Sequence, residues 1–306
     1  MTDFYERGYE RCIVTFIDIL GYRNLLKTKH ASELAAVMNA LRSFAAGDGD
    51  DGDSPSHIDE IRLNTQAFSE SVSDAVVRVR TVDTQSPDGP LVYELIDLLH
   101  AIIECLNRGI LIRGGVTIGP AYVGLNGKGP IFGPAMVRAF EIEQNEAVYP
   151  RIMIDEAVLA AYAQDDSLWQ NAEFDGGEAR LTRSFIGVSD DGSYFLDYLR
   201  AAGPGEFDAG VVGQFAFLRG HRELIVEGLR NDDAKVRRKF VWLANYHNRF
   251  VASLQASYDL SGSDGAFEAE LGISPQAMFD SLPIEPTWDR HLDRIHALAE
   301  SVADDW

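Results

Sequence analysis

The chain has 306 residues, of which 46% are hydrophobic and 25% charged, so it can bury a sizeable core and resembles neither a disordered nor a fibrous protein. Its 27 Lys and Arg residues against 48 Asp and Glu give a formal net charge of -21, which argues against a nucleic-acid-binding protein. The charged N-terminus lacks a signal-peptide core, and no apolar run approaches the roughly 18 residues that span a membrane. We therefore expect a cytoplasmic protein that does not insert into membranes.

The first half of the chain alternates predicted strands with predicted helices. β-Branched and aromatic residues at 12–19 predict a buried strand. Further strands are expected at 61–68, 75–80, 111–118 and 149–155, and helices at 32–44, 91–106, 134–145 and 156–164. The strands at 61–68 and 75–80 would form a hairpin with its turn near 70–73. This order indicates an α+β sheet with helices packed on it.

The second half is predicted to be mostly helical. A hairpin is expected at 185–199, followed by amphipathic helices at 214–227 and 233–256. No low-complexity linker separates the two parts, so we expect a domain at 1–170 and a C-terminal hairpin and helical extension, 171–306, packed on it. The two cysteines, Cys12 and Cys105, lie in apolar segments and are expected to be buried thiols.

Two aspartates are candidates for a metal site. Asp18 lies near the end of a buried strand, where a charge is costly unless it is paired or bound to a metal. Asp74 lies at the predicted hairpin turn, where turn chemistry alone also explains an aspartate. Two carboxylates at strand ends are a common way to hold Mg²⁺ or Mn²⁺ over a triphosphate.

Other polar and glycine-rich segments match no common binding motif. The acidic stretch at 47–57 fails the calcium-loop pattern, because Asp53 and Asp59 stand where Gly and Glu are needed. The glycine-rich stretch at 124–133 is not a P-loop, because Gly129 rather than Ser or Thr follows Lys128. Both stretches are predicted to be loops.

Five segments taken in order resemble the catalytic domain of class III nucleotide cyclases. They are FIDILGY (16–22), SDAVV (73–77), LIRGGVTIGPAYVG (111–124), FGPAMVRAFEIE (132–143) and YPRIMID (149–155). The segments at 132–143 and 149–155 look in particular like the bacterial pyrimidine cyclases of antiphage Pycsar systems, as does WLANYHN (242–248). The resemblance covers about residues 11–160 and implies a class III cyclase-like (ferredoxin-like) sheet.

The resemblance implies roles for individual residues. Asp18, Asp74 and the carbonyl of Ile19 would bind two divalent cations, Mn²⁺ or Mg²⁺. The backbone of Leu20, Gly21 and Tyr22 and the side chain of Arg113 would contact phosphate. Class III active sites form between two subunits, so a homodimer is implied in which Arg151 of one subunit binds the triphosphate held by the other.

The sequence also departs from the family pattern. Glu141 stands at the place of the transition-state arginine and Val137 at that of the ribose-orienting asparagine, so we expect Arg138, one turn before Glu141, to supply the missing charge. Glu70 and Pro130 replace the lysine and aspartate that read adenine.

These departures disfavour ATP and favour a pyrimidine nucleotide. They do not choose UTP over CTP. The resemblance implies that uridylate cyclases are common in this family, so the expected reaction converts UTP to 3′,5′-cyclic UMP, a second messenger in antiphage defence that a cyclic-nucleotide-responsive effector would read. A cytidylate cyclase, a purine cyclase and a degenerate nucleotide-binding domain are the alternatives. The sequence does not choose Mn²⁺ over Mg²⁺ and does not identify the activating signal.

Overall fold

The computed structural model describes residues 4–46, 67–72, 74–83, 88–124, 130–170, 178–201, 210–261 and 272–286. The chain forms two compact units, Met1–Ala202 and Gly203–Trp306. The acidic stretch predicted to be a loop at 47–57, and the middle of the glycine-rich stretch, lie outside the described residues. In the described part of the chain, no helix combines the length and the apolar character needed to cross a bilayer.

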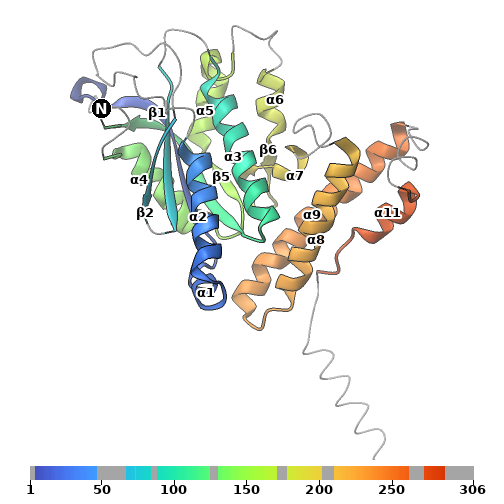
Figure 1. Cartoon of the computed structure of the whole chain (residues 1–306). Helices are drawn as coiled ribbons and strands as arrows, with labels where there is room; N and C mark the ends of the chain where they lie inside the picture. Colours follow the sequence, from blue (N-terminus) through green and yellow to red (C-terminus); the bar gives the residue numbers. More distant parts are fainter. Residues whose placement is uncertain are drawn as a thin grey trace, which may run out of the picture. The chain divides into compact units, whose positions relative to one another are not determined.

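The first unit is built on one seven-stranded sheet (Figure 1). Its strands are β1 (Glu10–Ile19), β2 (Ala67–Val72), β3 (Ala75–Thr81), β4 (Ile112–Ala121), β5 (Ile152–Ile154), β6 (Ile186–Val188) and β7 (Tyr194–Leu196). The order across the sheet is β2-β3-β1-β4-β5-β7-β6, and only the β4–β5 pair is parallel. The predicted α+β sheet with packed helices is confirmed.

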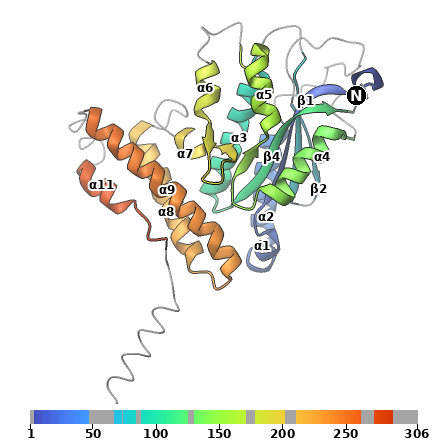
Figure 2. The ribbon, with the colours of Figure 1, turned by 180° about the vertical axis from the view of Figure 1, so that it is seen from behind.

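Helices cover both faces of this sheet, as Figures 1 and 2 show from opposite sides. The helices of this unit are α1 (Tyr22–Thr28), α2 (Ala31–Ala46), α3 (Pro90–Asn107), α4 (Pro134–Glu141), α5 (Glu156–Gln164), α6 (Glu178–Ser184) and α7 (Tyr198–Ala201). Helices α2 and α3 contact β1, β2 and β3 between them, while α4 contacts β1 and β4.

The central strand β1 sends alternate side chains to the two helical layers. Cys12 and Val14 pack with Ala135 and Ala139 of α4. Thr15 points the other way, and its hydroxyl donates a 2.8 Å hydrogen bond to Glu94 of α3. Alternation therefore places Asp18, two residues beyond Phe16, on the face of the sheet that α4 covers.

Three predicted boundaries are wrong. Residues 70–72, expected to form the hairpin turn, belong to β2, and Val72 pairs with Ala75 of β3; residues 61–66 of the strand expected at 61–68 lie outside the described residues. The strand expected at 149–155 is reduced to Ile152–Ile154. The helix expected at 134–145 ends at Glu141 and continues as a π-helical segment, η3 (Ile142–Glu146).

The hairpin predicted at 185–199 forms as β6–β7 and extends the sheet of the first unit. The second unit contains α8 (Gly210–Leu229), α9 (Ala234–Ser261) and α11 (Pro275–Ser281), and α8 and α9 pack against each other. Both predicted long helices are thus confirmed. Cys12 and Cys105 are buried free thiols, as expected.

Candidate active site

The sheet register brings Asp18 and Asp74 together. Asp18 pairs with Ala75 of β3 on one side and with Arg113 of β4 on the other, and Asp74 immediately precedes Ala75. The two carboxyl groups lie close enough for the charge of Asp74 to raise the pKa of Asp18.

The surroundings of Asp18 disfavour its negative charge. Burial, followed by repulsion from Glu143 and Asp74, raises the pKa of Asp18 from 3.8 to about 6, although Arg113 acts in the opposite direction. Asp18 thus lies near two other carboxyl groups, and a single guanidinium, that of Arg113, binds Asp18 and Glu143. The site carries a surplus of negative charge on the α4 face of the sheet.

Arg113 is held mainly by Glu143, a residue that the sequence did not single out. Its Nη2 atom lies 2.6 Å from Glu143 Oε1 and 3.4 Å from Asp18 Oδ2. Its Nη1 atom lies 3.5 Å from the carbonyl oxygen of Ala147. Glu143 has no exposed surface, so this ion pair fixes the guanidinium from behind the site.

The π-helical segment η3 explains why Glu143 points inward. A π-turn adds one residue relative to an α-turn and shifts the phase of the following side chains. Ile142 and Glu143 are consequently both buried, although they are adjacent in the chain. The 3.6-residue hydrophobic period of α4 does not predict that Glu143 is buried.

Two glycines of β4 allow the close packing around the site. A Cβ atom on Gly114 would lie 2.4 Å from the carbonyl oxygen of Phe16, and one on Gly115 would lie 2.5 Å from the side chain of Ile142. Larger residues would therefore displace β1 or η3.

The donor set fits a hard divalent cation. Mg²⁺ is commonly held by one or two carboxylates together with substrate phosphates and water, rather than by a complete protein cage. Asp18 and Asp74 supply such a pair. Among the described residues there is no group of three or more His, Cys, Asp or Glu side chains arranged to hold a metal ion. The remaining ligands would come from the Ile19 carbonyl, water and substrate.

The predicted phosphate-binding turn follows directly from β1. The amide of Leu20 donates to Leu111, and Gly21 precedes α1, which begins at Tyr22. This turn is therefore next to Asp18 in the fold as well as in the sequence. The hydrogen bonds of this turn in the described residues do not test its predicted role in phosphate binding.

Arg138 lies in another ion-pair network. Its Nε and Nη2 atoms bind the two carboxylate oxygens of Asp155 at 3.1 and 3.0 Å, and its Nη1 atom binds Glu146 at 2.5 Å. These hydrogen bonds, first that to Asp155, raise the pKa of Arg138. Asp155 also accepts a 2.6 Å hydrogen bond from Thr117 and was not among the predicted site residues.

Arg151 is buried and does not join the Asp18 cluster in this chain. Its side chain is 1% exposed and binds Asp191, in the β6–β7 turn, at 3.1 Å. Its guanidinium also lies over the rings of Tyr149 and Phe195. Its predicted contact with a triphosphate would require it to leave this environment.

The predicted base-reading positions do lie together. Glu70 Oε2 accepts a 3.3 Å hydrogen bond from the amide of Ile131, the residue after Pro130. Both Glu70 and Pro130 are exposed. The structure thus brings Glu70 of β2 into contact with the segment that leads to α4.

No protein-family model matches the sequence, and no curated protein matches it closely. Solved structures match it in part. A bacterial light-regulated adenylyl cyclase matches 51% of this chain and 81% of its own, with 16% identity and a TM-score of 0.34.

Two guanylyl cyclase structures give similar values. A double mutant of the guanylyl cyclase domain of the RhoGC fusion protein from the aquatic fungus Blastocladiella emersonii matches 61% of this chain and 94% of its own, with 18% identity and a TM-score of 0.38. The catalytic core of a rhodopsin-guanylyl cyclase with converted specificity, in complex with ATPalphaS, matches 61% and 95%, with 15% identity and a TM-score of 0.37. At such values the likeness identifies neither activity nor substrate, which have to come from the residues.

Proposed function

We propose that the chain is a metal-dependent nucleotide cyclase of the class III type that converts UTP to 3′,5′-cyclic UMP and pyrophosphate. The main support is the contact between Asp18 and Asp74 beside Arg113, where the surplus of negative charge suits divalent cations. The five ordered sequence segments that resemble class III cyclases support the same activity.

Asp18, Asp74 and the Ile19 carbonyl would hold the cations in this scheme. When bound, two Mn²⁺ or Mg²⁺ ions would neutralise the triphosphate and lower the pKa of the ribose 3′-hydroxyl that attacks the α-phosphorus. Arg113 would bind a phosphate oxygen, and Glu143 would keep its guanidinium in place. The turn at Leu20, Gly21 and Tyr22 would contribute backbone N–H groups to the phosphates.

The chemistry of Glu70 favours uracil. One carboxylate oxygen, Oε2, already accepts the amide of Ile131, which leaves Oε1 for the substrate. Uracil presents a single ring N–H donor between two carbonyl oxygens and suits one acceptor. Cytosine has an unprotonated ring nitrogen there, which a carboxylate would repel. Pro130 offers neither an N–H group nor a polar side chain to an adenine.

A guanylate cyclase is the second candidate. The adjacent N1–H and N2–H groups of guanine suit a carboxylate that can accept from both. This option would require Oε2 to accept a second hydrogen bond besides that from Ile131, or to release Ile131. A cytidylate cyclase, an adenylate cyclase and a domain that binds a nucleotide without turnover are less well supported by Glu70 and by the carboxylate pair.

Arg138 and Arg151 would act only after rearrangement. Arg138 would supply transition-state charge once it leaves Asp155, and Arg151 would reach a neighbouring subunit's triphosphate once it leaves Asp191. Both steps are compatible with substrate-induced closure, in which binding completes the catalytic arrangement.

We also propose a homodimer with shared active sites. The outer surface of α4 exposes Val137 and Phe140, which are 57% and 44% exposed, and Phe132 just before it is 43% exposed. Phe140 packs edge-to-face on Phe16, two residues before Asp18. A second subunit that covered these side chains would close over the carboxylates. The proposed cytoplasmic setting rests on the composition of the sequence, and the antiphage role and an effector that reads the product rest on the sequence resemblance.

Product analysis tests the activity. Purified protein is incubated with Mn²⁺ and equal concentrations of UTP, CTP, ATP and GTP, and the products are resolved by mass. We expect cyclic UMP, and none from the Asp18→Asn variant. Predominant cyclic GMP would favour the second candidate, cyclic CMP or cyclic AMP would correct the base assignment, and the absence of any product would contradict the cyclase proposal.

A further inference from the structure

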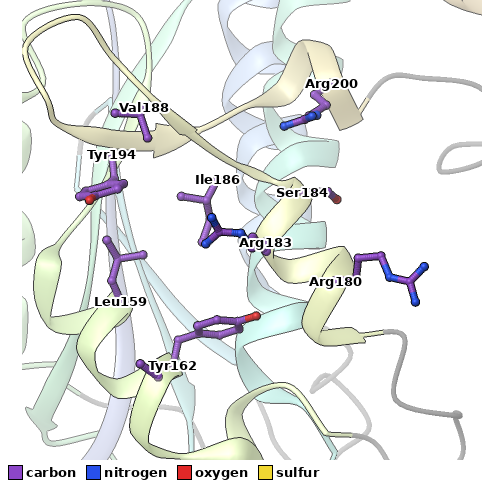
Figure 3. Close-up of a pocket in the computed structure, with 10 residues that line it drawn as sticks. Leu159, Tyr162, Arg180, Arg183, Ser184, Ile186, Val188, Tyr194 and Arg200 are labelled. Carbon is purple, nitrogen blue, oxygen red and sulfur yellow. The ribbon is translucent and has the colours of Figure 1, made fainter. Parts of the chain in front are cut away.

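A cavity lies near the edge of the sheet opposite to the edge strand that carries Glu70. It has a volume of about 700 Å³ and is formed by residues of α5, α6, β6, β7 and α7 (Figure 3). Strands β4, β5 and β7 separate its edge strand, β6, from the strand that carries Asp18. The volume falls within the range of small-molecule sites, and no residue of the proposed active site lines it.

The cavity is positively charged in a protein of net charge -21. Arg180, Arg183 and Arg200 line it, and none of its ten described lining residues is acidic. Within the described part of the chain, no ion pair is formed by these three guanidinium groups. Figure 3 shows Arg183 and Arg200 extending toward the space between α6 and the hairpin, whereas Arg180 extends away from it.

This arrangement contrasts with that of several other arginines of the first unit. Arg78, Arg113, Arg138 and Arg151 each bind at least one carboxylate within the described chain. Two unneutralised guanidinium groups at one concave site repel each other, and an anion between them relieves that repulsion. Guanidinium groups bind phosphate through paired hydrogen bonds.

The remaining wall of the cavity is aromatic and aliphatic. Tyr162 and Tyr194 line it, together with Leu159, Ile186 and Val188. The hydroxyl of Tyr162 donates a 2.7 Å hydrogen bond to the carbonyl of Ala179, which fixes its ring. Val188, which pairs with Tyr194 across the hairpin, is 62% exposed, and a ligand would cover it. Aromatic and aliphatic side chains of this kind accept the flat face of a nucleobase.

We propose that this cavity is a second nucleotide site, which binds a nucleoside phosphate with its phosphate on Arg183 and Arg200 and its base against Tyr194 and Tyr162. The site needs no metal ion, since the arginines supply the positive charge. It is separate from the Asp18–Asp74 pair, so the proposal stands or falls independently of the cyclase proposal.

Calorimetric titration in EDTA tests the proposal. Without divalent cations, the carboxylates of the proposed active site repel phosphates, so binding there is suppressed. The intact chain is titrated with UMP and AMP, with uridine and adenosine, which lack phosphate, and with ribose 5-phosphate, which lacks a base. We expect the nucleotides to bind at least about tenfold more tightly than either fragment class, because both halves of the cavity contribute.

Substitutions of the lining residues test whether the nucleotide binds in this cavity. Arg183→Ser and Arg200→Ser are each expected to weaken nucleotide affinity at least about tenfold, since each removes charge-assisted hydrogen bonds. Arg180→Ser should have a smaller effect, because its side chain extends away from the cavity. Arg108→Ser, at the residue that follows α3 and is paired with Glu104, is the control and should have none. Tyr194→Leu should reduce the affinity for nucleotides but not for ribose 5-phosphate.

Three outcomes would overturn the proposal. One is the absence of nucleotide binding to the wild-type chain in EDTA at millimolar concentration. Another is unchanged affinity in folded Arg183→Ser and Arg200→Ser variants, with folding checked by circular dichroism. The third is photocrosslinking of an azido-nucleotide to peptides outside α5, α6, α7 and the β6–β7 hairpin, a measurement on the wild-type chain that does not depend on variants that fold.

Discussion

Two clusters of charged side chains lie on opposite faces of the same sheet, and they are built on different principles. On the α3 face, Arg78 and Arg80 bind Glu94 through their Nε atoms at 2.9 and 3.0 Å, and both also bind Asp97. Two positive charges meet two negative ones. Burial raises the pKa of Glu94, but the two arginines outweigh burial and hold it below its ordinary value.

The α4 face carries the unbalanced cluster. Asp18 lies near Asp74 and Glu143, and in the described residues Arg113 is the guanidinium that offsets them. The pKa of Asp18 is raised to about 6 rather than lowered. In a balanced buried network, the attraction between opposite charges offsets much of the free energy lost when the charges leave water. The balanced network on the α3 face holds α3 on the sheet. An unbalanced one near the surface is stable only when it meets further positive charge. This imbalance is the feature that supports the proposal of a cation site at the second cluster.

The largest expected effect is on turnover. Asp18→Asn and Asp74→Asn should each reduce kcat by at least about 10³-fold, because each removes a proposed metal ligand. Both variants should unfold at the same or a slightly higher temperature than wild type, since the substitution removes like-charge repulsion. The control is Asp83→Asn, whose side chain is 72% exposed. Near wild-type activity of either variant with Mn²⁺ would refute the assignment.

Substitution in the balanced cluster should lower the stability of the fold, in contrast to substitution of Asp18 or Asp74. Glu94→Gln leaves two buried guanidinium groups with one carboxylate fewer, so we expect a loss of about 3–5 kcal/mol in the free energy of unfolding. Glu104→Gln, on the same helix, breaks a partly exposed pair with Arg108 and should cost less than about 1 kcal/mol. Urea titration measures both. Equal costs would show that the buried network contributes no more than a surface pair.

A third cluster, in the second unit, avoids charge altogether. His221 and His247 face each other with their Nδ1 atoms 3.0 Å apart, and His247 Nε2 lies 3.1 Å from the Leu282 carbonyl oxygen. Because that carbonyl can only accept, His247 carries its proton on Nε2, and His221 donates from Nδ1. A proton added to His247 Nδ1 would face the His221 N–H group.

This pair predicts a loss of stability in acid. Burial lowers the pKa of His247 from 6.5 to about 4 and that of His221 well below its ordinary value. The unfolded chain therefore binds more protons than the folded one in this range, so the stabilisation present above pH 6.5 is lost as the pH falls toward 4. We expect about 2 kcal/mol from His247 at pH 5.

Urea unfolding at pH 7.5 and pH 5 measures that loss. Replacing both histidines, as His221→Gln with His247→Gln, should reduce the pH dependence, whereas the exposed His100→Gln on α3 should not. A double variant with the wild-type pH dependence would show that other groups cause the acid sensitivity.

The smallest expected effect is that of Glu143→Gln. Arg113 would keep Asp18 as a partner but lose its buried ion pair, so its guanidinium would be less well fixed. Residues that orient such a group commonly contribute about tenfold to activity. We expect this loss mainly in KM for the triphosphate, with Glu143→Asp recovering part of it. A loss as large as that of Asp18→Asn would instead indicate that Glu143 acts directly.

The sequence predicted the parts of the site that lie on regular strands. The placement of Asp18 near a strand end and of Asp74 near a hairpin turn follows from alternation and from turn residues, and register then brings them together. Glu143 was missed because a π-turn breaks the 3.6-residue period from which burial was predicted. The arginine cavity was missed because Arg183 and Arg200 belong to separate elements, which only the sheet and its helices bring together.

The glycines of β4 also limit how this protein can diverge. Any side chain at Gly114 would collide with the backbone of β1, and any at Gly115 with η3, so substitutions there would move Asp18 or Glu143. The side of the site that is proposed to bind phosphate therefore tolerates few substitutions at these two glycines. Glu70 is exposed on the edge strand β2 and meets no such constraint. Relatives of this chain are expected to differ in the base they select long before they differ in how they hold the phosphates.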